Sequence, residues 1–183
     1  VNFVKKLKIE NINIFEIGGG NKPIFYFLKK YTDKNIFSYV LERDEIFEKY
    51  NKSVSQKYKN DLKYVKNVEE IKTKDFLIAY FGSSLQYLEN FEEINNQIVK
   101  NNIKYVIIFD TIFSTFDYDF YSLQVNMEPS IFPIKFLSLD KLIDMFKRNN
   151  YELIFEKTEN RNKFTHDKYK EELKAKYLIF ERK

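Results

Sequence analysis

Apolar and polar residues follow two alternating patterns along the first two thirds of the chain. Short apolar runs predict five β-strands, at 12–17, 36–41, 62–65, 75–81 and 105–109. Between these runs, apolar residues spaced three and four positions apart predict helices after Pro23, over 45–50 and over 88–100. Strands that alternate with helices predict an α/β fold, in which right-handed crossovers place helices on both faces of a parallel sheet.

The last third of the chain predicts a different ending to this sheet. Ser138 is a suitable N-cap for a helix over 139–149. Two further strands, over 151–157 and 176–181, have no helix between them, so we expect them to form an antiparallel hairpin at the sheet edge. The whole chain, 1–183, is therefore expected to form one domain with a Rossmann-like, doubly wound sheet of seven strands, mostly parallel.

One segment, 111–138, fits neither pattern. It contains many aromatic residues and two prolines, and its apolar residues keep no sustained period. Long irregular connections inside compact domains are commonly functional loops. We therefore expect a lid-like insertion at this place.

Charge and composition argue against two kinds of partner, nucleic acid and the membrane interior. The 31 basic and 27 acidic residues give a net charge of +4 but are dispersed along the chain, which argues against a nucleic-acid partner. There is no cysteine, and no apolar run approaches the roughly 20 residues that cross a bilayer. We therefore expect a cytoplasmic protein without a membrane span. Because the sequence starts at Val1 and not at Met, we also expect that an N-terminal segment precedes it.

The four glycines of the chain stand at the ends of two predicted strands. Gly18, Gly19 and Gly20 follow the first strand, and Gly82 follows the fourth. In a doubly wound sheet, ligands bind beyond the carboxyl ends of the strands, where the strand order reverses. A residue without Cβ adopts positive φ freely and lets the backbone approach a ligand closely. Both glycine sites are therefore predicted to border one ligand-binding crevice.

Two acidic residues add chemistry to the glycine turn. Glu42 ends the second strand, where a carboxylate can accept hydrogen bonds from both ribose hydroxyls of an adenosine ligand. Glu16 stands just before the glycines, and a carboxylate there repels phosphates but suits an amino group. Pro23 occupies the third glycine position of G-x-G-x-x-G, the pattern that receives a pyrophosphate, and argues against an NAD-dependent enzyme. An adenosine ligand with a cationic part, such as S-adenosylmethionine, fits these residues.

These residues resemble the cofactor loop of class I SAM-dependent methyltransferases. The stretch 16–20, E-I-G-G-G, is similar to the first motif of that family, although Lys22 replaces the last glycine of its fuller pattern E-x-G-x-G-x-G. The stretch 82–88, G-S-S-L-Q-Y-L, resembles the loop after its fourth strand. More narrowly, the chain resembles small bacterial methyltransferases encoded with surface-polysaccharide genes, through L-Q-Y-L at 85–88, Asp-Thr-x-Phe at 110–113 and P-S-I-F-P at 129–133.

The resemblance implies the class I methyltransferase fold, S-adenosylmethionine as cofactor, and methylation of an oxygen atom on a small molecule or sugar of surface-glycan biosynthesis. The cofactor-binding residues expected on these grounds are Glu16, Gly18, Gly19, Gly20, Glu42, Lys66, Asn67, Gly82 and Gln86. Lys66 and Asn67 are included because they follow the third strand, where an acid that contacts adenine is common in the family.

The acceptor side is expected beyond the fourth and fifth strands. Tyr87, Gln124 and Glu128 are the candidate substrate contacts, and Asp110, at the end of the fifth strand, is the candidate base. The single histidine, His166, lies in a polar segment and is predicted to be a surface residue. Tyr118, Phe120, Tyr121 and Phe132 are expected either to pack within the lid or to form an aromatic wall.

Two departures from the family leave an alternative open. Lys22 replaces a glycine of the cofactor loop, and the predicted cleft contains no histidine to act as a base. A catalytically degenerate, methyltransferase-like binding or scaffold module is therefore the second interpretation of this sequence.

Overall fold

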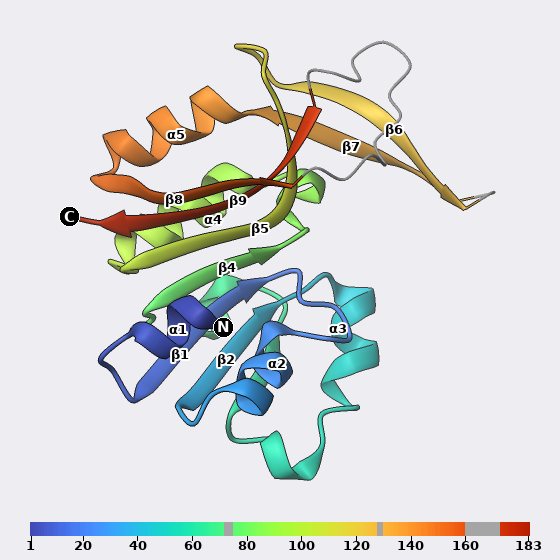
Figure 1. The fold of residues 1–183 in the computed structure, drawn as a ribbon. Coiled ribbons are helices and arrows are strands. Elements are labelled where there is room, and N and C mark those ends of the chain that lie inside the picture. Colours follow the sequence, from blue (N-terminus) through green and yellow to red (C-terminus); the bar gives the residue numbers. More distant parts are fainter. Residues whose placement is uncertain (72–74, 128–129, 160–172) are drawn as a thin grey trace.

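The computed structural model describes residues 1–71, 75–127, 130–159 and 173–183, and its main sheet has the predicted topology (Figure 1). Five strands run parallel in the order β3-β2-β1-β4-β5. Their bounds are β1 (Asn11–Ile17), β2 (Asn35–Leu41), β3 (Leu62–Val65), β4 (Ile78–Gly82) and β5 (Tyr105–Ser114). The C-terminal strands, β8 (Tyr151–Glu159) and β9 (Leu173–Arg182), form the expected antiparallel hairpin, and β9 pairs with β5. The strand order reverses between β1 and β4, where a ligand crevice is expected.

Side chains of the sheet alternate between two cores, one on each face. In β4, Ile78 and Tyr80 face one core, whereas Ala79 and Phe81 face the other. Helices α1 and α2 cover the first core, and α4 and α5 cover the second (Figure 1). Because both faces are covered, the sequence of β4 is apolar almost throughout.

Of the helices predicted with both bounds, α4 and α5 are shorter than expected, whereas α3 is one residue longer at each end, and α1 was not predicted. The bounds of the helices are α1 (Asn2–Lys6), α2 (Ile24–Tyr31), α3 (Asp44–Asn51), α4 (Phe91–Lys100) and α5 (Leu139–Arg148), with 3₁₀ turns η1 (Gln56–Tyr58), η2 (Val68–Glu70) and η3 (Leu85–Tyr87). In the described part of the chain, no helix is long and apolar enough to cross a membrane.

Two element boundaries were predicted wrongly for the same reason. The helix expected over 88–100 begins only at Phe91, because the chain first forms η3 and is extended at Leu88. The strand expected over 75–81 begins at Ile78, although Phe76 is already buried, with 6% exposure. An apolar residue type predicts that the side chain is buried, but it does not say whether the backbone is a helix, a strand or a loop. Apolar loop residues next to an element therefore made the element look longer.

The segment 111–138 is not the irregular connection that its sequence suggested. β5 continues through Ser114, and β6 (Phe120–Met127) and β7 (Ser130–Ser138) form an antiparallel ribbon, here called the arm. The described strands therefore number nine, where seven were expected. Apolar residues occupy both faces of the arm, so its sequence lacks the polar-apolar alternation that signals a strand. The arm projects beyond the rest of the sheet (Figure 1), and its role as a lid stays a prediction.

Candidate functional site

The chain leaves β1 through a turn in which each glycine meets a different requirement. Gly18 has a φ of +73° and Gly20 a φ of +57°, a region that side chains rarely adopt. A Cβ at Gly18 would lie 2.6 Å from the Cβ of Ser84, and a Cβ at Gly19 would lie 2.8 Å from Oε1 of Glu16. A Cβ at Gly20 would meet no heavy atom within 4 Å. The turn is therefore tightly packed at its first two glycines and open at the third.

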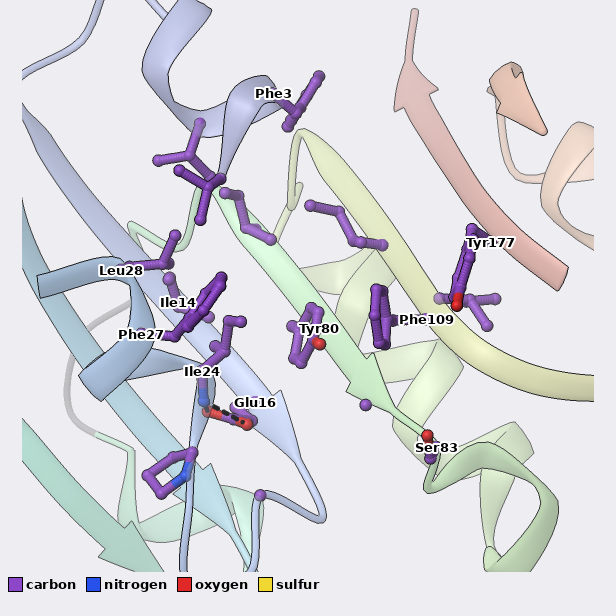
Figure 2. A pocket seen from close by; sticks show the side chains of 18 of the residues that line it. Phe3, Ile14, Glu16, Ile24, Phe27, Leu28, Tyr80, Ser83, Phe109 and Tyr177 are labelled. Carbon is purple, nitrogen blue, oxygen red and sulfur yellow. Dashed lines mark hydrogen bonds between the residues drawn. The ribbon is translucent and has the colours of Figure 1, made fainter. Parts of the chain in front are cut away.

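Glu16 lies beneath this turn and is only 2% exposed. Its two carboxylate oxygens accept hydrogen bonds from the backbone N–H of Ile24, at 2.9 and 3.0 Å (Figure 2). Ile24 is the first residue of α2, and the N-cap residue Pro23 makes no side-chain hydrogen bond to the helix. Glu16, on β1, therefore caps this helix. Burial raises the pKa of Glu16 to about 8, and the charge of Glu42 adds to the rise. At neutral pH, Glu16 is therefore mostly protonated in the protein alone.

Glu42 contacts the same turn from the end of β2. Its Oε1 accepts a hydrogen bond from the Gly20 N–H at 2.5 Å, and the Tyr64 hydroxyl donates to the Gly20 carbonyl oxygen at 2.7 Å. Burial raises the pKa of Glu42 above its usual range, and the bond from Gly20 opposes this rise. Sequence reasoning missed Tyr64. Parallel pairing puts it beside Val40, close to the end of β2, and Glu42 is the residue that follows β2.

The turn after β4 forms a second wall of the site. Ser84 Oγ donates to the Ile17 carbonyl oxygen at 2.5 Å, which ties this turn to the end of β1. Gln86 is 5% exposed, and its Nε2 donates to the Ser83 carbonyl oxygen at 3.1 Å. Its Oε1 is buried and has no hydrogen-bond partner within the described residues. Buried polar atoms in folded proteins almost always have a partner, so this oxygen is an exception, although Gln86 does not line the cavity described below.

A cavity of about 780 Å³ opens beside both turns, on the sheet face that carries α1 and α2 (Figure 2). Four of the predicted cofactor residues line it, namely Glu16, Gly18, Gly19 and Gly82, and so do Lys22 and Ser83, which were not predicted as contacts. The other five predicted cofactor residues are not among its lining residues: Gly20, Glu42, Lys66, Asn67 and Gln86. Tyr80, Phe109 and Tyr177 lie in a row along its floor, on β4, β5 and β9, and the last two rings stack with centroids 4.5 Å apart. Sequence reasoning missed these three residues because alternation indicates which side chains share a face, and not whether that face is left open.

Lys66 and Asn67 are engaged in local structure at the end of β3. The Lys66 ammonium nitrogen lies 2.9 Å from a carboxylate oxygen of Glu48 and 3.6 Å from one of Asp44, both on α3. Asn67 Oδ1 accepts a hydrogen bond from the Glu70 N–H at 3.1 Å and caps η2. These contacts hold both side chains toward α3 and η2, so a contact with adenine would have to use their backbone or aliphatic parts.

Asp110 lies where β5 bends. The pairing of β5 with β9 shifts register between Ile108 and Thr111, and Asp110 has a φ of +54°. Aspartate tolerates this conformation better than most residues, and such positions are common at functional sites. Burial is the main cause of the raised pKa of Tyr80, with smaller effects from the charges of Glu16 and Asp110. Asp110 is thus electrostatically coupled to a tyrosine on the cavity floor, which stays protonated at neutral pH.

Tyr87 and Gln124, both predicted on the acceptor side, contact each other. The Tyr87 hydroxyl donates to Gln124 Oε1 at 2.6 Å, and its ring packs edge-on against Phe132 with centroids 6.2 Å apart. These contacts fasten η3 to the arm. Glu128 and His166 lie outside the described residues.

The four aromatic residues that were expected either to pack within the lid or to form an aromatic wall are divided between surfaces. Tyr118 and Phe120 lie with ring centroids 6.4 Å apart, and Phe120 packs against the buried Phe136. Tyr121 lies on the opposite face of the arm and is 71% exposed. Strand alternation therefore excludes a single wall made of all four.

Solved structures share this fold at low sequence identity, whereas no protein-family model and no curated protein matches the sequence. A SAM-dependent methyltransferase from Methanosarcina mazei matches with a TM-score of 0.66 and 12% identity, over 100% of this chain and 97% of that one. The [4+2]-cyclase SpnF matches with a TM-score of 0.65 and 7% identity, over 98% and 78% of the two chains. The glycopeptide N-methyltransferase MtfA, complexed with S-adenosylmethionine, matches with a TM-score of 0.59 and 10% identity, over 99% and 90%. The chain therefore has the class I methyltransferase fold, with its mostly parallel core and antiparallel C-terminal hairpin.

Proposed function

We propose that this chain is a methyltransferase that uses S-adenosylmethionine and methylates an oxygen atom of a small molecule. The observation that carries the proposal is the pair of acidic side chains, the buried Glu16 and the half-buried Glu42, on two sides of the glycine turn. S-adenosylmethionine has a sulfonium, an ammonium group and two ribose hydroxyls, all of which suit carboxylate neighbours. Among the matched structures MtfA contains this cofactor, whereas SpnF is a cyclase. The fold alone therefore does not determine the reaction, and the proposal rests on the site.

The polar atoms at the crevice fit this cofactor. Glu42 accepts backbone bonds from Gly20 and Arg43, and a carboxylate has about four acceptor positions, so it retains capacity for ribose hydroxyls. Gln86 stays a proposed neighbour of the ammonium group, although its buried Oε1 would have to turn toward the ligand to accept a hydrogen bond. The open side of Gly20 leaves room for a ligand against the backbone. Lys66 and Asn67 remain the proposed neighbours of adenine, through parts of these residues that their side-chain contacts leave free.

The residues of this chain would prepare the reaction by binding, charge compensation and proton removal. The bound cofactor supplies an electrophilic methyl group. A cation near Glu16 favours the ionised carboxylate, so we expect Glu16 to release its proton when the cofactor binds. Asp110 is the proposed base for the acceptor hydroxyl, and Tyr87 and Gln124 are the proposed acceptor contacts. The apolar cavity walls would keep water away from the reacting groups.

The acceptor is proposed at the level of chemical class. We propose a small molecule or sugar with a free hydroxyl, methylated in the cytoplasm. A sugar of surface-glycan biosynthesis is the candidate that the sequence resemblance adds. Glu128 is retained as a proposed acceptor contact on the same grounds.

Isothermal titration calorimetry with S-adenosylmethionine tests the proposal directly. We expect binding by the wild type and at least tenfold weaker binding by Glu42→Ala, because bonds to a charged group contribute about 1.5–3 kcal/mol. Glu45→Ala is the matched control, since Glu45 is an exposed glutamate on the neighbouring α3. Folded wild-type protein that does not bind S-adenosylmethionine would overturn the proposal.

Turnover separates the proposed enzyme from the second candidate, a degenerate binding module. That candidate is favoured by Lys22, which lines the cavity where the family pattern has glycine. Formation of S-adenosylhomocysteine with fractionated small-molecule extracts supports the enzyme. Tight binding of S-adenosylmethionine with no turnover on any fraction supports the binding module.

A further inference from the structure

The outer face of the arm carries an exposed stripe of large apolar side chains. Tyr121, Leu123 and Val125 alternate along β6 and are 71%, 69% and 58% exposed, and Ile131, which pairs with Val125, is 56% exposed. These four residues are here called the outer stripe. The intervening residues Ser122 and Gln124 point the other way, and Ile134, which pairs with Ser122 from β7, is 3% exposed. The arm therefore packs one apolar face against the protein and presents a second one to water.

The outer stripe lacks the charges that normally protect an exposed strand. β6 contains no charged residue, in a chain in which 32% of residues are charged. Among the described residues, the cation beside Tyr121 is already paired, because the Lys135 ammonium lies 2.9 Å from an Asp119 carboxylate oxygen and 5.9 Å from the centre of the Tyr121 ring. Natural strands at the periphery of sheets use charges or proline to prevent association. On β7, Pro133 can prevent association in this way, but β6 contains neither a charged residue nor a proline.

We propose that the outer stripe is a contact between two copies of this chain, which pack their arms face to face about a two-fold axis. In such a contact each patch meets its own copy, so the patch must be self-complementary. An apolar patch whose adjoining cation is already paired meets this condition. Among the exposed large apolar side chains of the described residues, the four of the outer stripe are the most exposed, at 56% to 71%, whereas Phe27 and Phe155 are at 50% and 46%, so contact at the stripe removes the most apolar surface from water.

The contact has a consequence for the site, because the two faces of the arm belong to the same strands. Gln124 lies between Leu123 and Val125 and accepts the hydrogen bond from Tyr87 on the inner face. Packing the outer stripe against a second copy restrains β6 and, with it, the position of Gln124 relative to η3. The dimer would thus hold the arm in place over this end of the sheet. This inference does not depend on the identity of the cofactor.

Light scattering after size-exclusion chromatography tests the contact on the wild-type chain. We expect a mass twice the 22.3 kDa of one chain, which falls toward 22.3 kDa on dilution. Leu123→Lys places a cation in the outer stripe and should leave a monomer at every concentration. Ile154→Lys is the matched control, because Ile154 lies on β8, away from the arm, and is 42% exposed. The control should form the same dimer as the wild type.

Three outcomes would overturn the proposal. The first is a wild type that is monomeric at all concentrations, and the second is a dimer that Ile154→Lys dissociates and Leu123→Lys does not. The third is a monomer that sediments with phosphatidylcholine vesicles, which would assign the stripe to a lipid surface.

Because the chain has no cysteine, Leu123→Cys introduces a single thiol for cross-linking with a short bismaleimide. The cross-linked dimer should form with Leu123→Cys and not with Ile154→Cys, and circular dichroism checks that each variant is folded.

Discussion

The glycine turn and the arm are held in place in opposite ways. At the turn, Glu42 and Tyr64 bind the N–H and the carbonyl oxygen of Gly20, and Glu16 binds the first N–H of α2. The arm is held by the pairing of β7 with β5 and from its inner face, where Ile134 and Phe136 are buried and Tyr87 bonds to Gln124, and its other face is apolar and exposed. Buried polar groups therefore determine the shape of the turn, whereas the position of the arm depends on strand pairing and on contacts at one face.

The two regions should also differ in how their stability depends on pH. The turn is built on two carboxyl groups whose pKa values burial raises, so its stability must depend on pH. The outer stripe contains no carboxyl group, and its contribution depends on apolar contact. Substitutions in the two regions should therefore differ in size, in pH dependence and in the property that they change.

The largest effect is expected from pH acting on Glu16. Its pKa rises from 4.5 to about 8 on folding, so the folded state binds the proton more tightly and loses stability as pH rises between these values. The full shift corresponds to roughly 5 kcal/mol, at about 1.36 kcal/mol per unit. Urea unfolding from pH 4.5 to 9 should show the wild type losing stability relative to Glu16→Gln, whose amide does not titrate. A constant difference between the two proteins across this range would contradict the raised pKa.

The next largest effect is expected at the tightest glycine. Gly18→Ala combines a positive φ with a Cβ 2.6 Å from that of Ser84, and we expect a loss of about 3 kcal/mol in the free energy of unfolding. Gly20→Ala is the matched control, because it shares the positive φ but meets no atom within 4 Å. Its expected loss is about 1 kcal/mol. Equal losses in urea unfolding would show that backbone conformation alone makes these glycines necessary.

A smaller effect is expected where the arm is fastened. Tyr87→Phe removes the hydroxyl that donates to Gln124, and we expect a loss of about 0.5–1 kcal/mol because the bond is exposed. Hydrogen exchange should become faster in β6 and stay unchanged in β1. In a double-mutant cycle with Gln124→Ala, the two effects should not add. Strict additivity would mean that this hydrogen bond does not hold the arm.

The smallest effect on the folding of one chain is expected in the outer stripe. Leu123→Lys should change the free energy of unfolding of the monomer by less than about 0.5 kcal/mol, because the side chain is already 69% exposed. Chemical unfolding at low protein concentration measures this quantity apart from any association. A loss of several kcal/mol would show that the stripe packs against the same chain.

The sheet could be predicted because each parallel strand depends on local pattern. The apolar runs of β1, β2 and β4 and the positions of the glycines indicate strands that end at one crevice. The arm escaped prediction because its two faces are both apolar for different reasons. Ile134 is buried against the protein, whereas Leu123 is exposed to water, and residue type cannot separate these cases.

The acidic residues and the glycines of the site were predicted from the sequence, whereas its aromatic residues were not. Glu16 and Glu42 stand out in sequence because each is a charged residue in or directly after a mostly apolar strand run. Tyr64, Tyr80 and Phe109 belong to apolar runs like many others in this aromatic-rich chain. They line or contact the site only because register and strand order bring β3, β4 and β5 beside the glycine turn.

The sequence by itself determined the alternation of strands and helices, the positions of the two glycine turns and the acids that accompany the first of them. These properties depend on residue spacing and on the absence of Cβ, which are local. Only the tertiary structure decided which groups meet across the sheet: Glu42 with Gly20, Glu16 with the start of α2, and Tyr87 with Gln124. Such contacts, and the raised pKa of Glu16 that burial causes, arise from packing between distant segments, and spacing along the chain does not encode them.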